Sequence, residues 1–146
     1  MDTVVVFKID EQQLALPVSQ VLRVIWAVEI TAMPGQGDRK LGVINVEGTV
    51  VPVANIRSIL QLPAREIDLD DHIVIAEASE QRVAFPVDRV DCVLHYEPDE
   101  LSGVNTHEDQ LSSQVLKHEG ELIVILSIKQ LLIEMGNKAL LAGSNR

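Results

Sequence analysis

The chain has 146 residues, enough for one domain or for two very small subdomains that share a core. Apolar residues make up 47% of it and aromatic residues only 3%, so the core must be aliphatic, which favours β structure. The net charge of −10 (12 − 22) disfavours nucleic acid and anionic lipid as partners, because both would repel the chain. Proteins and small molecules remain as candidate partners.

Several other kinds of site and segment are excluded by the residues present. The single cysteine, Cys92, leaves no intrachain disulfide and no thiolate metal cluster. The four histidines are far apart and no two have i, i+4 spacing, so we expect no metal and no cofactor. No apolar run approaches the ~20 residues of a membrane-spanning helix, and the first residues do not have the pattern of a cleavable leader. We therefore expect a cytoplasmic protein with no direct membrane insertion.

An internal repeat is the strongest feature of the sequence. The segment LALPVSQV, which begins at Leu14, reappears as VAFPVDRV from Val83, at an offset of 69 residues (83 − 14). A second segment, VINVEG from Val43, reappears as VLKHEG from Val115, at an offset of 72 residues (115 − 43). Two matches in the same order with nearly equal offsets indicate a duplication.

Each copy predicts three strands followed by a hairpin. In the first copy the expected strands are residues 3–9, 13–16, 21–26, 41–46 and 49–53. In the second copy the first three are residues 72–76, 82–85 and 90–96. The two hairpins turn at Glu47-Gly48 and at Glu119-Gly120, where glycine supplies the positive φ that a tight turn requires. Five short strands per copy, joined by tight turns, indicate a small barrel.

A helix is expected after each hairpin. Asn55 can cap a helix at residues 56–60, because its side chain can accept a backbone N–H. Ser127 with Gln130 forms a capping-box pattern for a terminal helix, whose apolar residues recur at i, i+3, i+4 and i+7.

The expected organisation is a single domain over residues 1–146. Either copy alone, at about 60–70 residues, would be marginally stable, so the copies should pack on each other. The polar stretch 63–71 divides them. The expected subdomains are residues 14–62 with the N-terminal strand 3–9, and residues 72–135, followed by a tail at residues 138–146.

Residues 42–57, GVINVEGTVVPVANIR, resemble the central motif of CheW-like domains, G-V-x-N-L-R-G-x-[VI]-[VI]-P-V-[VI]-D-L-R. Residues 16–18 and 21–25 resemble an earlier motif of the family, and the resemblance extends from about Val4 to Leu132. It implies a mainly β fold with two SH3-like five-stranded barrel subdomains that share an aliphatic core, with short helices and a C-terminal helix.

The resemblance also implies a function in bacterial chemotaxis. Members of this family are non-enzymatic adaptors that couple the cytoplasmic tips of chemoreceptors (methyl-accepting proteins) to the regulatory domain of a sensor histidine kinase. Such a protein would be recruited to membrane-associated receptor arrays. Within the duplication, kinase binding is expected chiefly from the first copy, which keeps the motif. The second copy would support the shared core and form one wall of a receptor groove.

Three positions depart from the family's pattern. Glu47 stands where the family has a basic residue, and Arg23 stands where it often has an acidic one. We hypothesise that these two side chains face each other as a pair of reversed polarity, which would affect partner choice more than stability. Asn55 replaces the usual aspartate, which caps a helix equally well.

The motif implies a set of partner-binding residues, several of which have a structural interpretation as well. The set is Arg23, Glu47, Gly48, Val51, Pro52, Asn55 and Arg57. Arg57 is interpreted first as a solvated helix residue. Pro52 predicts an edge strand or a bulge, with Val51 and Val53 beside it as contact candidates. Trp26, the only tryptophan, is assigned to the core or the seam rather than to an interface.

Two alternative functions remain. A divergent CheW-like adaptor of another chemosensory pathway, such as one for surface motility, could bind only one of the usual partners, and the Arg23 and Glu47 reversal keeps this alternative open. An acid-rich hydrolase is disfavoured, because its carboxylates would have to converge in a cleft. Here the carboxylates cluster in turns and linkers.

Overall fold

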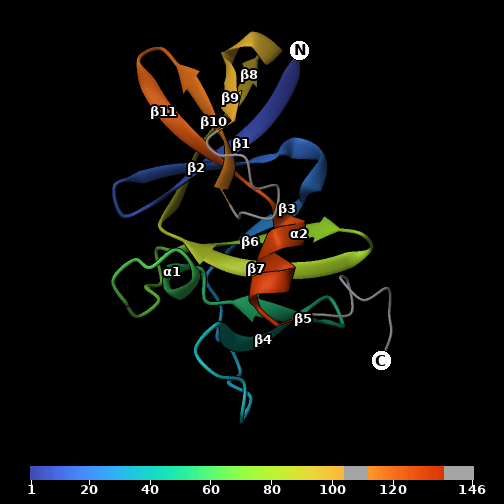
Figure 1. Cartoon of the computed structure of the whole chain (residues 1–146). Coiled ribbons are helices and arrows are strands. Elements are labelled where there is room, and N and C mark those ends of the chain that lie inside the picture. Colours follow the sequence, from blue (N-terminus) through green and yellow to red (C-terminus); the bar gives the residue numbers. More distant parts are fainter. Residues whose placement is uncertain (104–111, 137–146) are drawn as a thin grey trace.

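The computed structural model describes residues 1–103 and 112–136, so the tail expected at residues 138–146 lies outside the described residues. The strands form two sheets, which Figure 1 shows one above the other. The first sheet contains β1 (Asp2–Ile9), β2 (Gln12–Pro17), β8 (Arg89–Tyr96), β9 (Leu101–Gly103), β10 (Ser112–His118) and β11 (Glu121–Leu126). The second contains β3 (Val21–Trp26), β4 (Lys40–Val46), β5 (Thr49–Ala54), β6 (His72–Ala78) and β7 (Gln81–Val87).

Short helices follow β2, β5, β8 and β11. The 3-10 turns are η1 (Val18–Gln20) and η2 (Pro98–Glu100), and the α-helices are α1 (Ile56–Ile59) and α2 (Ile128–Glu134). Both predicted helix caps are confirmed: Asn55 Oδ1 accepts the Ser58 N–H at 3.3 Å, and Ser127 Oγ accepts the Gln130 N–H at 3.1 Å. Among the described residues, no helix combines the length and the apolar character needed to cross a membrane.

The order of the strands reproduces the duplication seen in the sequence. The first sheet has the order β8-β1-β2-β11-β10-β9 and the second the order β3-β6-β7-β5-β4. By the repeat offsets, β1 corresponds to β6, β2 to β7, β3 to β8, β4 to β10 and β5 to β11. If each strand in the order β8-β1-β2-β11-β10 is replaced by its counterpart in the repeat, the order becomes β3-β6-β7-β5-β4, which is that of the second sheet. Each sheet also has one parallel pairing, β2 with β11 and β5 with β7.

Neither sheet comes from one copy alone. The β1–β2 hairpin of the first copy joins strands of the second copy, and the β6–β7 hairpin of the second copy lies between β3 and β5 of the first. The polar stretch 63–71 therefore divides the copies of the repeat and not the two sheets. Residues 14–62 and residues 72–135 each contribute strands to both sheets, so the two halves exchange hairpins.

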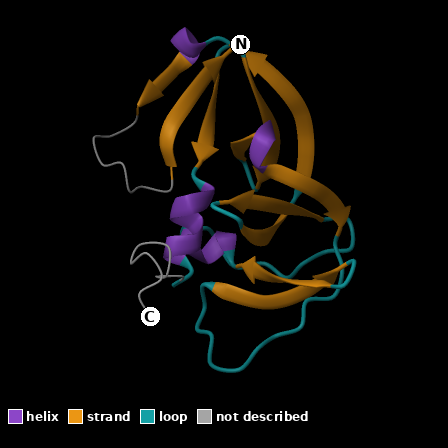
Figure 2. Ribbon diagram, turned by 90° about the vertical axis from the view of Figure 1, so that its right-hand side faces the viewer, coloured by secondary structure: helices purple, strands orange, loops and turns teal. Residues whose placement is uncertain are grey.

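The core has a shared central part and one smaller part within each sheet. The central cluster draws on both sheets and on both α-helices, with Phe7 and Phe85 in contact at a ring-centroid distance of 5.5 Å. The smaller clusters surround Leu116 in the first sheet and Ile73 in the second. Figure 2 shows several helical turns beside the junction of the two groups of strands, and another at the far end of the upper group. The mainly β fold is thus confirmed, and the shared core is largely aliphatic.

One strand prediction is half right. Pro52 was expected to mark an edge strand or a bulge. β5 is not an edge strand, because it lies between β4 and β7, but its ladder with β4 has a register shift between Lys40 and Gly42, close to the pairing of Pro52 with Val43. Pairing between β5 and β7 is confined to Val53 with Ala84. The proline is tolerated here because the β5–β7 pairing involves a single residue pair, so few ladder hydrogen bonds depend on an N–H from Pro52.

Candidate partner-binding surface

The edge strand β3 exposes apolar side chains. Leu22, Val24 and Trp26 are all exposed, and Trp26 keeps 63% of its surface accessible. Its indole stacks on the ring of His72, with ring centroids 4.3 Å apart. The assignment of Trp26 to the core or seam is therefore wrong. Alternation along an edge strand explains this, because Ile25 turns toward the core cluster of the second sheet while its neighbours face outward.

Arg23 and Glu47 face each other, as hypothesised from the exchange of acid and base. Arg23 Nη1 lies 2.7 Å from Glu47 Oε2, and both side chains are largely exposed. The pair joins β3, one edge of the second sheet, to the turn that follows β4, its other edge. An exposed pair of this kind contributes about 0–1 kcal/mol to folding, so its main effect is on the charge that a partner meets.

The β4–β5 turn holds Glu47 in a fixed position. Glu47 and Gly48 both have positive φ values, 51° and 87°, and the Gly48 N–H donates to Asn45 Oδ1 at 2.8 Å. This is the tight two-residue turn that the sequence predicts. Gly48 is exposed at its tip.

Both valines proposed beside Pro52 are in the core. Val51 is 1% exposed and Val53 is fully buried, so neither side chain is available to a partner. Val50, between the turn and Val51, is 65% exposed. Strand alternation places Val51 and Val53 on the same inner face, a pattern that the continuous apolar run in the sequence conceals.

Both polar atoms of the Asn55 side chain form hydrogen bonds. Beside the cap to Ser58, its Nδ2 donates to the carbonyl of Asp38 at 2.8 Å. The backbone N–H of Asn55 donates to the carbonyl of Arg39 at 2.9 Å. The residue therefore ties the start of α1 to the long β3–β4 connection, a contact that the sequence does not indicate.

Arg57 is partly buried and links two sheets, so it is not a solvated helix residue. Its side chain is 11% exposed, and Nη2 lies 2.8 Å from Asp10 Oδ1 and 3.0 Å from Asp88 Oδ1. Asp10 follows β1 and Asp88 follows β7, so α1 is fastened to both sheets. Two residue pairs separated by 47 and 31 positions make this link, which is why no local pattern in the sequence predicts it.

A second arginine extends this network. Arg65 Nη2 lies 2.7 Å from Asp88 Oδ1 and 3.0 Å from Asp71 Oδ1, and Asp71 is buried. Burial alone would raise the pKa of Asp88. The backbone N–H of Asp10 and the two guanidinium groups outweigh it, so the pKa of Asp88 lies below its ordinary value of 3.8. The stretch 63–71 is thus not a simple solvated linker.

Side chains that could hold a metal ion do not gather in the described part of the chain. Within residues 1–103 and 112–136, no three His, Cys, Asp or Glu side chains form such a group. Two of the histidines have other neighbours instead, since His95 lies 2.8 Å from the Thr3 hydroxyl and His118 lies 3.1 Å from Glu100.

A duplicated pair of small sheets around a shared core, with exposed apolar and charged side chains on an edge strand, defines a compact protein-interaction domain. Comparison with known families identifies which one. The CheW-like domain matches residues 3–135, and the chain belongs to this family.

Named relatives and a solved structure agree with this assignment. The chain is 34% identical to the chemotaxis protein CheW of Thermotoga maritima over 131 residues, covering 88% of this chain and 86% of the relative. It is 29% identical to the chemotaxis protein CheW of Bacillus subtilis over 135 residues, covering 90% and 86%. The crystal structure of the scaffolding protein TtCheW from Thermoanaerobacter tengcongensis is similar with a TM-score of 0.79 and 25% identity, covering 86% of this chain and 88% of that one.

Proposed function

We propose that this protein is a non-enzymatic chemotaxis adaptor that couples the cytoplasmic tips of chemoreceptors to the regulatory domain of a sensor histidine kinase. Its family and its CheW relatives support the adaptor or scaffold role. The observation that carries the binding function is the exposed apolar row of β3, which ends in Trp26. Large exposed aromatic residues on an otherwise polar surface are typical anchors of protein interfaces.

The proposed kinase-binding surface is the turn of the first copy that carries Glu47 and Gly48, with Arg23 beside it. Pro52 and Asn55, both half-buried, would shape this region rather than provide its anchors. Through the receptors that it binds, the protein would be recruited to membrane-associated arrays in the cytoplasm.

One observation favours a second candidate, a divergent adaptor of another chemosensory pathway that binds only one of the two partners. The Arg23–Glu47 pair has the reverse of the family's usual polarity while keeping a 2.7 Å contact. A partner adapted to the usual polarity would meet like charges at both positions, and like-charge contacts at an interface exclude partners effectively.

A pull-down against the receptor tip and the kinase regulatory domain of the same genome tests both candidates. Binding to both supports the coupling adaptor, binding to the kinase domain alone favours the divergent adaptor, and binding to neither refutes both. Trp26→Ala should weaken binding of at least one partner about 30-fold, the size expected when an anchor residue is truncated. Leu122→Ala is the matched control, since Leu122 is equally exposed but lies on β11 of the other sheet.

A further inference from the structure

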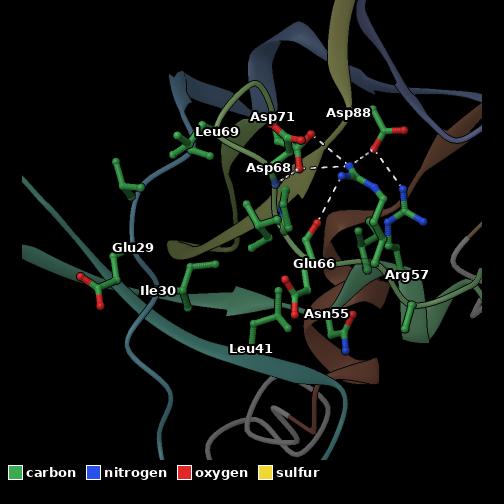
Figure 3. A pocket seen from close by; sticks show the side chains of 17 residues that line it. Glu29, Ile30, Leu41, Asn55, Arg57, Glu66, Asp68, Leu69, Asp71 and Asp88 are labelled. Atoms are coloured by element: carbon green, nitrogen blue, oxygen red, sulfur yellow. Dashed lines mark hydrogen bonds and ion pairs between the residues drawn. The ribbon is translucent and has the colours of Figure 1, made fainter.

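A cavity of about 750 Å³ lies next to the proposed binding surface, and its lining begins at Ala27, directly after Trp26. Its walls are the β3–β4 connection on one side and the α1–β6 connection on the other, and the start of α1 and the end of β7 contribute to its lining. This volume is in the range of sites that hold a small ligand or a few residues of a peptide. Figure 3 shows the side chains that line it.

The β3–β4 connection is held firmly against the second sheet. Thr31 and Val43 exchange two backbone hydrogen bonds of 2.9 Å each. Gly42, at φ 144°, makes this approach possible, because a Cβ at that position would lie 2.1 Å from the Thr31 carbonyl oxygen. On the opposite wall, Arg65 and Asp71 fix the α1–β6 connection. The cavity is therefore bounded by braced segments.

Much of its lining is apolar and open to water. Val28, Ile67 and Leu69 line the cavity and are exposed, and Leu69 keeps 85% of its surface accessible. Ile30 and Leu41 continue the apolar lining. Exposed apolar side chains gathered around one concave site indicate a surface that a ligand covers.

The charged lining is predominantly acidic. Five carboxylates (Glu29, Glu66, Asp68, Asp71 and Asp88) and two guanidinium groups (Arg57 and Arg65) line it, a sum of −3 (2 − 5). Both arginines are already paired with Asp10, Asp71 and Asp88.

The remaining carboxylates lie outside these ion pairs, although Asp68 Oδ1 accepts the Asp70 N–H at 2.9 Å. No ion pair between described residues includes Glu29, Glu66 or Asp68. In Figure 3, Glu66 lies near Leu41 between the two walls, whereas Glu29 points outward from the β3–β4 connection at the rim. An apolar wall with unpaired carboxylates around it complements a cation on an aliphatic stem.

We infer that this cavity binds a short basic and aliphatic segment of a protein partner, with an arginine or lysine side chain beside Glu66 and Glu29 adding negative charge at the rim. The aliphatic residues of the segment would cover Val28, Ile67 and Leu69. An anionic ligand would be repelled by the net charge of the lining. The inference rests on the proposed function in one respect, namely that the ligand is a segment of a protein. The pull-down experiments test β3 and the β4–β5 turn, so they test the proposed function separately from the cavity.

Nuclear magnetic resonance titration of the ¹⁵N-labelled full chain tests this inference directly. The probe is the peptide acetyl-Leu-Arg-Leu-amide, and its matched control is acetyl-Leu-citrulline-Leu-amide, which has nearly the same shape without the charge. The arginine peptide should give saturable shifts in amides of residues 27–41 and 64–71. The citrulline peptide should bind at least about fivefold more weakly, which corresponds to one partly exposed charge contact.

Charge variants locate the interaction. Glu29→Gln with Glu66→Gln should weaken the arginine peptide about fivefold and leave the citrulline peptide unchanged. The control, Glu77→Gln with Glu80→Gln, makes the same change of net charge at the far end of the β6–β7 hairpin, roughly 20 Å along the strands from the cavity. It should leave the affinity for both peptides unchanged. Both exchanged glutamates of the cavity are exposed, so the variants should keep the melting temperature of the parent.

Three results would overturn the inference. They are equal affinity for the two peptides, shifts that map to β3 instead of the cavity walls, and the absence of saturable shifts at the solubility limit of the arginine peptide. Any of these together with intact pull-downs would remove the cavity site and leave the adaptor function standing. Saturable cavity shifts with failed pull-downs would do the reverse.

Discussion

Replacing Arg57 tests whether the link between α1 and the two sheets stabilises the fold. Arg57→Ala removes four hydrogen bonds, two to Asp10, one to Asp88 and one to the Pro63 carbonyl. Breaking a fully buried ion pair costs about 3–5 kcal/mol. Here the carboxylates of Asp10 and Asp88 are 35% and 28% exposed and regain water, so we expect a loss of about 2–3 kcal/mol. The melting temperature should fall by about 5–10 °C.

Urea unfolding at pH 7, followed by far-ultraviolet circular dichroism, measures this loss. The matched control is Arg82→Ala, because Arg82 is exposed on β7, and its free energy of unfolding should stay within about 0.5 kcal/mol of the parent. Arg57→Lys should lie between the two, since one ammonium cannot reproduce the fork that contacts both carboxylates. If Arg57→Ala unfolds at the same urea concentration as Arg82→Ala, the network does not stabilise the junction.

The Asp88 network, the β3–β4 connection and the exposed Arg23–Glu47 pair can each be tested by substitution. Because the pKa of Asp88 in the folded state lies below its ordinary value of 3.8, its stabilisation is present above pH 3.8 and is lost below it, as the pH falls through the folded-state pKa. Acid unfolding curves of Arg57→Ala should therefore be flatter than those of the parent below pH 3.8. Gly42→Ala should destabilise by more than about 2 kcal/mol in urea unfolding, since the added Cβ meets the Thr31 backbone, and a change below about 0.5 kcal/mol would contradict the close approach. Arg23→Glu with Glu47→Arg should change stability by less than about 1 kcal/mol but alter which kinase domains are bound, and unchanged partner choice would refute the polarity hypothesis.

Much of the fold could be predicted from the sequence because the signals are local and repeated. The hairpin turns at Glu47-Gly48 and Glu119-Gly120 and the caps at Asn55 and Ser127 depend on neighbouring residues, and each occurs where expected. The exchange of hairpins between the copies could not be predicted in this way. Repeat offsets show which strands correspond, but not whether a strand pairs within its own copy or with the other.

The candidate site was predictable only in part. The contact between Arg23 and Glu47 could be predicted, because the acidic and the basic residue of the family pattern are exchanged at these two positions. By contrast, Val51 and Trp26 were each assigned to the wrong environment, because an apolar side chain alone does not reveal whether its strand face points inward. The role of Arg57 depends on Asp10 and Asp88, which reach it through the tertiary fold.

A bridging experiment tests whether this protein couples a receptor to a kinase. The receptor tip is immobilised, the kinase regulatory domain is supplied in solution, and its capture is measured by surface plasmon resonance with and without this protein. A coupling adaptor predicts that the kinase domain is retained only when the protein is present, and less well when it carries Trp26→Ala. Equal retention of the kinase domain in the presence and absence of the protein would contradict the coupling function.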